Sequence, residues 1–187
     1  MKSNYLQNMF SLEGKVALVT GGGRGIGQVI CRELARAGAD IAVFSRSGAS
    51  ETVKLIESEG GKVLDIIADA TDESSVKEGM KKIMEVYRRL DIVINNAGVC
   101  YHKDAFEATV EEWRECLDIN LTGEYIVCRE AARVMIDNNF KGSIVNIASM
   151  SGHIVNVPQC QAAYNASKAG VIHMTKSLAI EWMTPAL

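Results

Sequence analysis

Tyr164 and Lys168 are residues whose types and spacing could carry out proton transfer. Residues four apart lie on one face of an α-helix, so the Lys168 ammonium can lie beside the Tyr164 phenol. A phenol has a usual pKa of about 10, and a nearby positive charge lowers it. A shift of about three units requires roughly 4 kcal/mol of differential stabilisation. The pair predicts a tyrosine that exchanges protons near neutral pH, and an ordinary helix surface is the alternative interpretation.

Ser149 lies fifteen residues before Tyr164, directly after an apolar segment. Its hydroxyl could orient a carbonyl or an alcohol group beside the phenol. This arrangement requires the end of a strand to lie next to the helix that carries Tyr164.

Short apolar segments alternate with helical patterns along the chain. Strands are expected at 15–20, 41–45, 62–68, 91–95 and 143–148, and helices at 50–59, 72–89 and 109–139, with one ending at Ala37 and one carrying Tyr164. This alternation predicts an α/β fold with a doubly wound, Rossmann-like parallel sheet of strand order 3-2-1-4-5. Residues 1–187 are expected to form a single dinucleotide-binding and catalytic domain, with residues 1–14 as a loosely packed arm.

Polar or glycine residues follow every predicted strand. In such sheets, ligands bind beyond the carboxyl ends of the strands, near the point where the strand order reverses. The segments found there are Gly21–Gly27, Ser45–Arg46, Asp69, Asn95–Gly98 and Ser149. Their convergence on one edge of the sheet predicts a single ligand site.

The glycine loop between the first strand and the first helix is expected to bind a pyrophosphate. Glycines let the backbone turn tightly, and the helix N-terminus offers unpaired N–H groups to an anion. The residues assigned to this role are Gly21, Gly23, Arg24, Gly25, Ile26 and Gly27. No Gly-Lys-Ser/Thr sequence follows, which excludes a P-loop.

The end of the second strand favours NADP over NAD. NAD-binding domains place an acidic residue there, on the adenosine ribose, whereas this chain has Ser45 and Arg46. Arg46 and Arg24 offer cations for a 2′-phosphate, although Arg46 could equally be a solvated surface charge. Asp69 is a candidate to accept a hydrogen bond from the adenine amino group, or else caps the turn at Thr71–Asp72.

Composition excludes several classes of function. The net charge of −3 gives no electrostatic case for nucleic acid or an anionic membrane. The five cysteines form no zinc-type spacing, so no metal is expected, and their odd number favours a reducing compartment. There is no signal-peptide pattern and no apolar run of membrane-spanning length, so a cytoplasmic protein is expected.

Taken together, these motifs resemble the short-chain dehydrogenases/reductases. The matching residues are Thr20, Gly21, Gly25–Gly27, Asn95–Gly98, Asn120, Ser149, Tyr164 and Lys168. The resemblance implies that Tyr164 is the general acid/base, that Ser149 holds the substrate oxygen, and that Lys168 contacts the nicotinamide ribose. It also implies that Asn120 bends its helix and holds a water linked to Lys168. Without the resemblance, Asn120 would be interpreted as a surface residue of a helix. The cofactor site would include Asn95, Ala97 and Gly98, with Tyr164 and Lys168.

The segments 152–158 and 171–182 are similar to the polyol and ketose reductases of that family, such as mannitol, sorbose, xylulose and gluconate enzymes. This implies an NADP-dependent oxidoreductase of polyol metabolism that interconverts a ketone and a secondary alcohol. Ser151, His153 and Gln159 are candidate substrate contacts, with plain loop chemistry as the alternative. A 3-ketoacyl thioester reductase and a non-catalytic NADP-binding or interaction module are the competing functions.

The chain departs from the family pattern after Trp182, where a sixth strand and a Pro-Gly loop would follow. The sequence is therefore expected to be truncated at its C-terminus, with a naturally short relative of the family as the alternative. The last helix is broadly apolar and needs covering, so a homodimer or homotetramer is expected, formed through the helices at 109–139 and 162–183.

Overall fold

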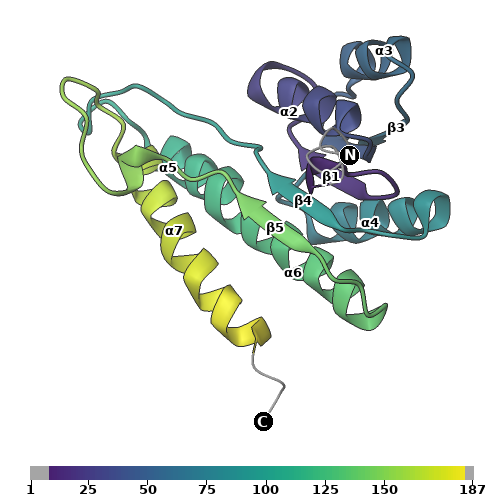
Figure 1. Cartoon of the computed structure of the whole chain (residues 1–187). Helices are drawn as coiled ribbons and strands as arrows, with labels where there is room; N and C mark the ends of the chain where they lie inside the picture. Colours follow the sequence, from purple (N-terminus) through teal and green to yellow (C-terminus); the bar gives the residue numbers. More distant parts are fainter. Residues whose placement is uncertain (1–8, 184–187) are drawn as a thin grey trace.

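The computed structural model describes residues 9–183, which form a five-stranded parallel sheet with helices on both faces (Figure 1). The strands lie in the order β3-β2-β1-β4-β5, which confirms the predicted fold class. Their bounds are Val16–Thr20 (β1), Asp40–Ser45 (β2), Val63–Ile67 (β3), Ile92–Asn95 (β4) and Ser143–Asn146 (β5). The carboxyl ends of all five strands therefore point to the same edge of the sheet.

The helices occupy the segments between these strands. Their bounds are Gly25–Arg36 (α2), Ser50–Ser58 (α3), Glu73–Tyr87 (α4), Val110–Leu117 (α5), Gly123–Asp137 (α6) and Ala162–Met183 (α7), with a π-helical turn η1 at Asp118–Thr122 and a 3₁₀ turn η2 at Met150–Gly152. Two starts are fixed by side chains. Asp72 accepts hydrogen bonds from the first turn of α4, and Thr109 and Glu112 form a capping box at α5.

Alternate residues of β1 point into two separate hydrophobic clusters. Val16 and Leu18 pack with residues of α4 and α6 on one face of the sheet. Ala17 and Val19 pack with residues of α2 and α3 on the other. All four side chains are buried, as the unbroken apolar run of a strand covered on both faces requires.

Several predicted boundaries differ from the observed ones. The expected helix at 109–139 contains the π-helical turn, and the expected strands at 62–68 and 143–148 are shorter in the structure. Within the predicted N-terminal arm, the backbone N–H of Leu12 donates a hydrogen bond to the backbone oxygen of Ala37, directly after α2. Residues 1–8 of that arm, and residues 184–187 after the last helix, lie outside the described residues.

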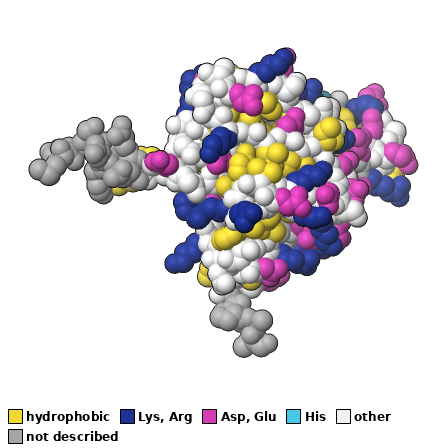
Figure 2. Space-filling view, turned by 90° about the vertical axis from the view of Figure 1, so that its right-hand side faces the viewer, with side chains coloured by type: hydrophobic (Ala, Val, Ile, Leu, Met, Phe, Trp, Pro, Cys, Tyr) yellow, Lys and Arg dark blue, Asp and Glu magenta, His cyan; other side chains and the backbone are white. Residues whose placement is uncertain are grey.

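The surface mixes charges of both signs. Figure 2 shows basic and acidic side chains next to one another, with hydrophobic side chains between them. Within residues 9–183, no helix has both the length and the apolar character needed to cross a membrane.

Candidate functional site

A cavity of about 550 Å³ lies at the carboxyl ends of β1, β2 and β4, beside the start of α2. This volume suits a small-molecule or cofactor site. Its lining comes from the glycine loop, the end of β2, the segment after β3 and the segment after β4: Thr20, Gly21, Gly23–Gly27, Phe44–Gly48, Ala68–Thr71, Asn96–Val99 and Ile119. The structure thus brings together most of the residues expected to bind a cofactor.

The glycine loop is shaped by two requirements that larger residues would not meet. Gly21 and Gly25 adopt positive φ angles of 66° and 57°. At Gly27, a Cβ atom would lie 2.3 Å from the backbone oxygen of Gly21. The helix therefore packs directly on the loop, and its cap residue Arg24 makes no side-chain capping bond. The first N–H groups of α2 are left facing a cavity that fits a pyrophosphate.

The end of β2 presents a hydroxyl and a cation to the same cavity. Ser45 lines the cavity, and its buried Oγ has no hydrogen-bond partner among the described residues. Arg46 and Arg24 are exposed, and both line the cavity. Residues 46–50, directly after the strand, include no acidic residue, and the nearby Asp65 carboxylate on β3 accepts a hydrogen bond from Ala49 N at 2.7 Å.

Asp69 lines the cavity and also caps a turn. Its Oδ1 accepts hydrogen bonds from the backbone N and the hydroxyl of Thr71, at 2.9 and 2.8 Å. The turn-capping alternative is thus observed. The hydrogen bond from the adenine amino group stays a prediction. Asp69 would have to accept it in addition to the two hydrogen bonds from Thr71.

The two asparagines after β4 have different positions. Asn95, expected at the cofactor, is fully buried, and its Nδ2 donates to Asn146 Oδ1 at 2.9 Å. It joins β4 to β5 and is absent from the cavity lining. Asn96 lines the cavity instead, and its Nδ2 donates to the backbone oxygens of Thr20 and Gly21. Strand alternation could have distinguished these neighbours, because only one of them can point into the core.

Asn120 connects the cavity to the helix that carries Tyr164. It is fully buried within the π-helical turn, so the interpretation as a surface residue was wrong. Its amide accepts from Val99 N and donates to Val99 O, both at 2.8 Å, and also donates to Ser167 Oγ at 3.1 Å. Local π-helical geometry often accompanies functional sites. Here it directs one side chain to both the cavity wall and α7.

Lys168 occupies a buried position on α7, one turn after Tyr164. Its Nζ donates to the backbone oxygen of Ile147, just beyond β5, at 2.5 Å, and lies 3.8 Å from Glu124 Oε2. Burial lowers the pKa of Lys168, and the Glu124 charge acts in the opposite direction. Tyr164 is half-buried near the start of the same helix. Neither Tyr164 nor Lys168 lines the cavity, which lies on the other side of the Asn120 linkage.

Ser149 directly precedes the 3₁₀ turn, which packs against α7. Its Oγ accepts a hydrogen bond from Ser151 N at 3.1 Å, which leaves the hydroxyl proton available as a donor. The turn after β5 thus packs against the helix that carries Tyr164, and the role of Ser149 beside the Tyr164 phenol stays a prediction.

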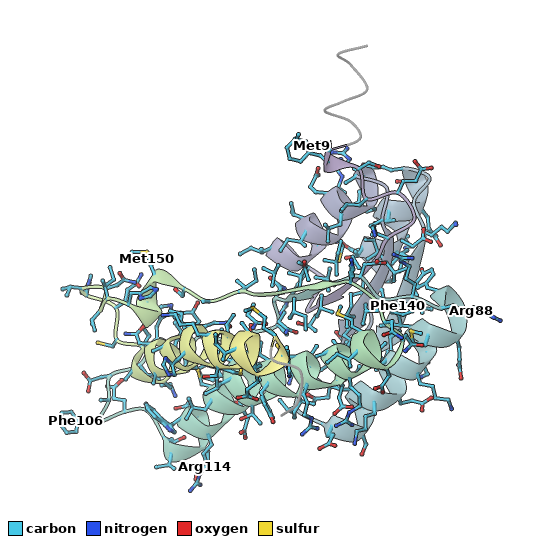
Figure 3. The ribbon with its side chains drawn as sticks, turned by 60° about the horizontal axis from the view of Figure 1, so that its bottom comes forward. Met9, Arg88, Phe106, Arg114, Phe140 and Met150 are labelled. Atoms are coloured by element: carbon cyan, nitrogen blue, oxygen red, sulfur yellow. The ribbon has the colours of Figure 1, made fainter. Side chains whose placement is uncertain are left out.

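The three candidate substrate residues have different surroundings. Ser151 is buried, and its Oγ accepts from Asn156 Nδ2 and Gln161 Nε2, so it stabilises its own loop. His153 and Gln159 are exposed. In Figure 3 the exposed side chains of Met150 and Phe106 lie at one end of the molecule, away from Phe140.

The chain is similar to known proteins both in sequence and in structure. Residues 15–185 match the short chain dehydrogenase family. Sorbose reductase of Candida albicans is 38% identical over 187 residues, covering 97% of this chain and 66% of that protein. An NADP-dependent mannitol dehydrogenase of Alternaria alternata is 39% identical over 183 residues, covering 95% and 68%.

The fold has an equally clear counterpart. A short-chain type dehydrogenase/reductase from Mycobacterium marinum, known from its crystal structure, superposes with a TM-score of 0.91 at 37% identity, covering 93% of this chain and 71% of that one. The chain thus spans about two thirds of the length of these proteins.

Proposed function

The chain belongs to the short-chain dehydrogenase family, and on this premise we propose that it interconverts a ketone and a secondary alcohol with NADP(H). The observation that carries the proposal is the buried Lys168 ammonium, held one helical turn from Tyr164 on a helix whose Ser167 is hydrogen-bonded to Asn120 beside the cavity wall. A binding module without catalysis has no need of this arrangement. The reaction adds a hydride to the carbonyl carbon and a proton to its oxygen.

Tyr164 is the proton donor in this proposal. The nicotinamide, when bound, supplies the hydride. Lys168 is fixed by Ile147 O, which holds its positive charge on the helix that carries Tyr164. Ser149, with a free hydroxyl proton, orients the substrate oxygen. General acid catalysis of this kind contributes about 10²–10⁴-fold to the rate.

The cofactor is NADP rather than NAD. Arg46 and Arg24 line the cavity next to the unpaired Ser45 hydroxyl, where a 2′-phosphate would be bound by charge-assisted hydrogen bonds. None of residues 45–50 is acidic, so the position at which NAD-binding domains hold the free 2′-hydroxyl has no carboxylate. The name of the mannitol dehydrogenase relative agrees with this choice.

The substrate is a sugar or a polyol. Two relatives carry the names sorbose reductase and mannitol dehydrogenase. His153 and Gln159 on the exposed loop before α7 are the polar groups proposed to contact the substrate hydroxyls.

Residues 1–187 form one domain in this proposal, and it assembles as a homodimer or homotetramer in the cytoplasm. The helices α5, α6 and α7 expose large apolar side chains, namely Val110, Trp113, Tyr125, Ile136, Trp182 and Met183. A symmetric helix-to-helix interface would remove them from water.

A cofactor and substrate screen tests the proposed function. NADPH oxidation is measured with sorbose, fructose and xylulose, and in parallel with an acetoacetyl thioester; NADH replaces NADPH in a second series. We expect turnover with a ketose and NADPH, and none in the Tyr164→Phe variant. Faster turnover of the thioester would identify a ketoacyl reductase. NADPH binding without turnover of any carbonyl compound would indicate a binding module.

A further inference from the structure

Glu124 is a buried carboxylate that the mechanism above does not use. It lies in the first turn of α6, four residues after Asn120, and is 3% exposed. Neither carboxylate oxygen has a hydrogen-bond partner among the described residues. The nearby Ile147 N–H lowers the pKa of Glu124. It donates its hydrogen bond to Asn95 O at 2.9 Å, however, and not to the Glu124 carboxylate. A buried carboxylate without hydrogen bonds is costly, so its position calls for a specific role.

The cation closest to Glu124 is Lys168, whose Nζ lies 3.8 Å from Oε2. Both side chains are almost completely buried, so water screens their interaction weakly. The other titratable groups in this region are thiols. Burial raises the pKa of Cys128, on the next turn of α6, to about 11, and also raises that of Cys116 on α5. Both thiols are therefore neutral near pH 7, and Glu124 and Lys168 carry the local charge.

Another glutamate of the same helix provides a contrast. Glu130 is 4% exposed, but its carboxylate accepts hydrogen bonds from Arg129 at 2.9 Å and Arg133 at 3.3 Å. Glu130 is thus a buried anion that is paired with two arginines. Glu124 has no such donors and is directed toward the lysine of the catalytic helix.

We propose that Glu124 is a positioning residue, which holds the Lys168 ammonium in place and sets the net charge beside Tyr164. The inference rests on the proposed function, since it concerns the same proton-transfer site. A protonated Glu124 leaves the pair with one positive charge, and an ionised Glu124 leaves it with none. The two states therefore present different electrostatic fields to the proton-transfer site.

The charge of the pair changes in the neutral range. Burial raises the pKa of Glu124 to about 7, against the opposing effect of the Lys168 charge. Glu124 thus gains or loses its proton where the enzyme would operate, and the electrostatic field at Tyr164 responds to pH.

A proton titration tests the ionisation without any substrate. The parent protein, Glu124→Gln and the matched control Glu130→Gln are titrated between pH 8 and pH 6. Over this pH interval, we expect Glu124→Gln to take up about one proton fewer per chain than the other two proteins. If all three curves coincide, Glu124 does not titrate there and the inference is wrong. Infrared difference spectra of the parent, in which a protonated carboxyl band should grow as the pH falls, decide the matter if Glu124→Gln does not fold.

The pH profile of kcat/KM tests the functional consequence. In NADPH-dependent reduction, the parent and Glu130→Gln should show an inflection near pH 7, which Glu124→Gln should lack and Glu124→Asp should recover at a shifted pH. A purely structural role would lower the rate equally at every pH, and that result would overturn the proposal. If the parent reduces no carbonyl compound, the proposed function fails, while the proton titration still decides whether Glu124 titrates.

Discussion

Replacing Gly27 with alanine should disrupt the cofactor site through one close contact. The added Cβ would lie 2.3 Å from Gly21 O, 2.9 Å from Gly21 C and 2.5 Å from Asn96 Nδ2. Overpacking of this kind costs about 1–3 kcal/mol, and loss of the Asn96 hydrogen bonds adds about 1 kcal/mol. Backbone atoms cannot rotate away as a side chain can, so the overlap cannot be relieved by a side-chain movement. The total cost is about 2–4 kcal/mol.

This cost should divide between binding and stability. If the loop moves to relieve the overlap, NADPH binding must return the loop to its original conformation. The affinity for NADPH then falls by as much as about 30- to 700-fold. Strain that is not relieved lowers the Tm, by about 2–4 °C per kcal/mol for a chain of this size. Fluorescence titration with NADPH and a thermal melt measure the two parts.

Gly142→Ala is the matched control for this prediction. Its Cβ would meet Met135 Sδ at 2.6 Å and Asp91 O at 2.9 Å, an overlap of similar severity outside the cavity. We expect this variant to lower the Tm and leave NADPH affinity unchanged. Parental affinity and parental Tm in Gly27→Ala would refute the reasoning, because the loop would then accept a side chain at no cost.

Further predictions address other parts of the molecule. Tyr164→Phe should bind NADPH as the parent does and lose about 10²–10⁴-fold in turnover. Arg46→Asp should erase or invert a preference for NADPH over NADH of about ten- to a hundredfold, measured as a ratio of Kd values; equal parental affinities would contradict it. Asp72→Ala removes the cap of α4 and should lower the free energy of unfolding by about 1 kcal/mol, as denaturant titration would show. Two arginines lower the pKa of Glu59 to about 2, so its stabilising contribution, present above its ordinary pKa of 4.5, should fade as the pH drops toward 2. Denaturation of Glu59→Gln should therefore differ from the parent at pH 6 and converge with it in acid.

The fold could be predicted because each strand is a short apolar run between turn residues. β1 and β2 are buried along their length, so hydrophobicity and sheet position coincide there. β5 ends earlier than its apolar run, since pairing with β4 stops at Asn146 opposite Asn95. Apolar residues after that point belong to a loop, and composition does not distinguish the two states.

Site residues could be predicted where their position along the backbone decides their role. They were harder to predict where side-chain packing decides it. The strand ends placed the glycine loop and Arg46 at the cavity. Asn120 appears as one polar residue in a helical pattern, and its burial depends on the π-helical turn around it. Glu124 likewise resembles any charged helix residue, because only the packing of α6 against the region of α7 shows that water cannot reach it.

The π-helical turn at Asp118–Thr122 also restricts how the length of this chain can change. Successive residues of a helix are rotated by about 100° around its axis. A deletion or insertion of one residue between Asn120 and Glu124 would therefore rotate all of α6 relative to α5. Glu124 would turn away from Lys168, and the apolar side chains of α6 would leave the core. Length variation among related chains should fall in the exposed loops before α5 and α7, and this segment should keep its number of residues.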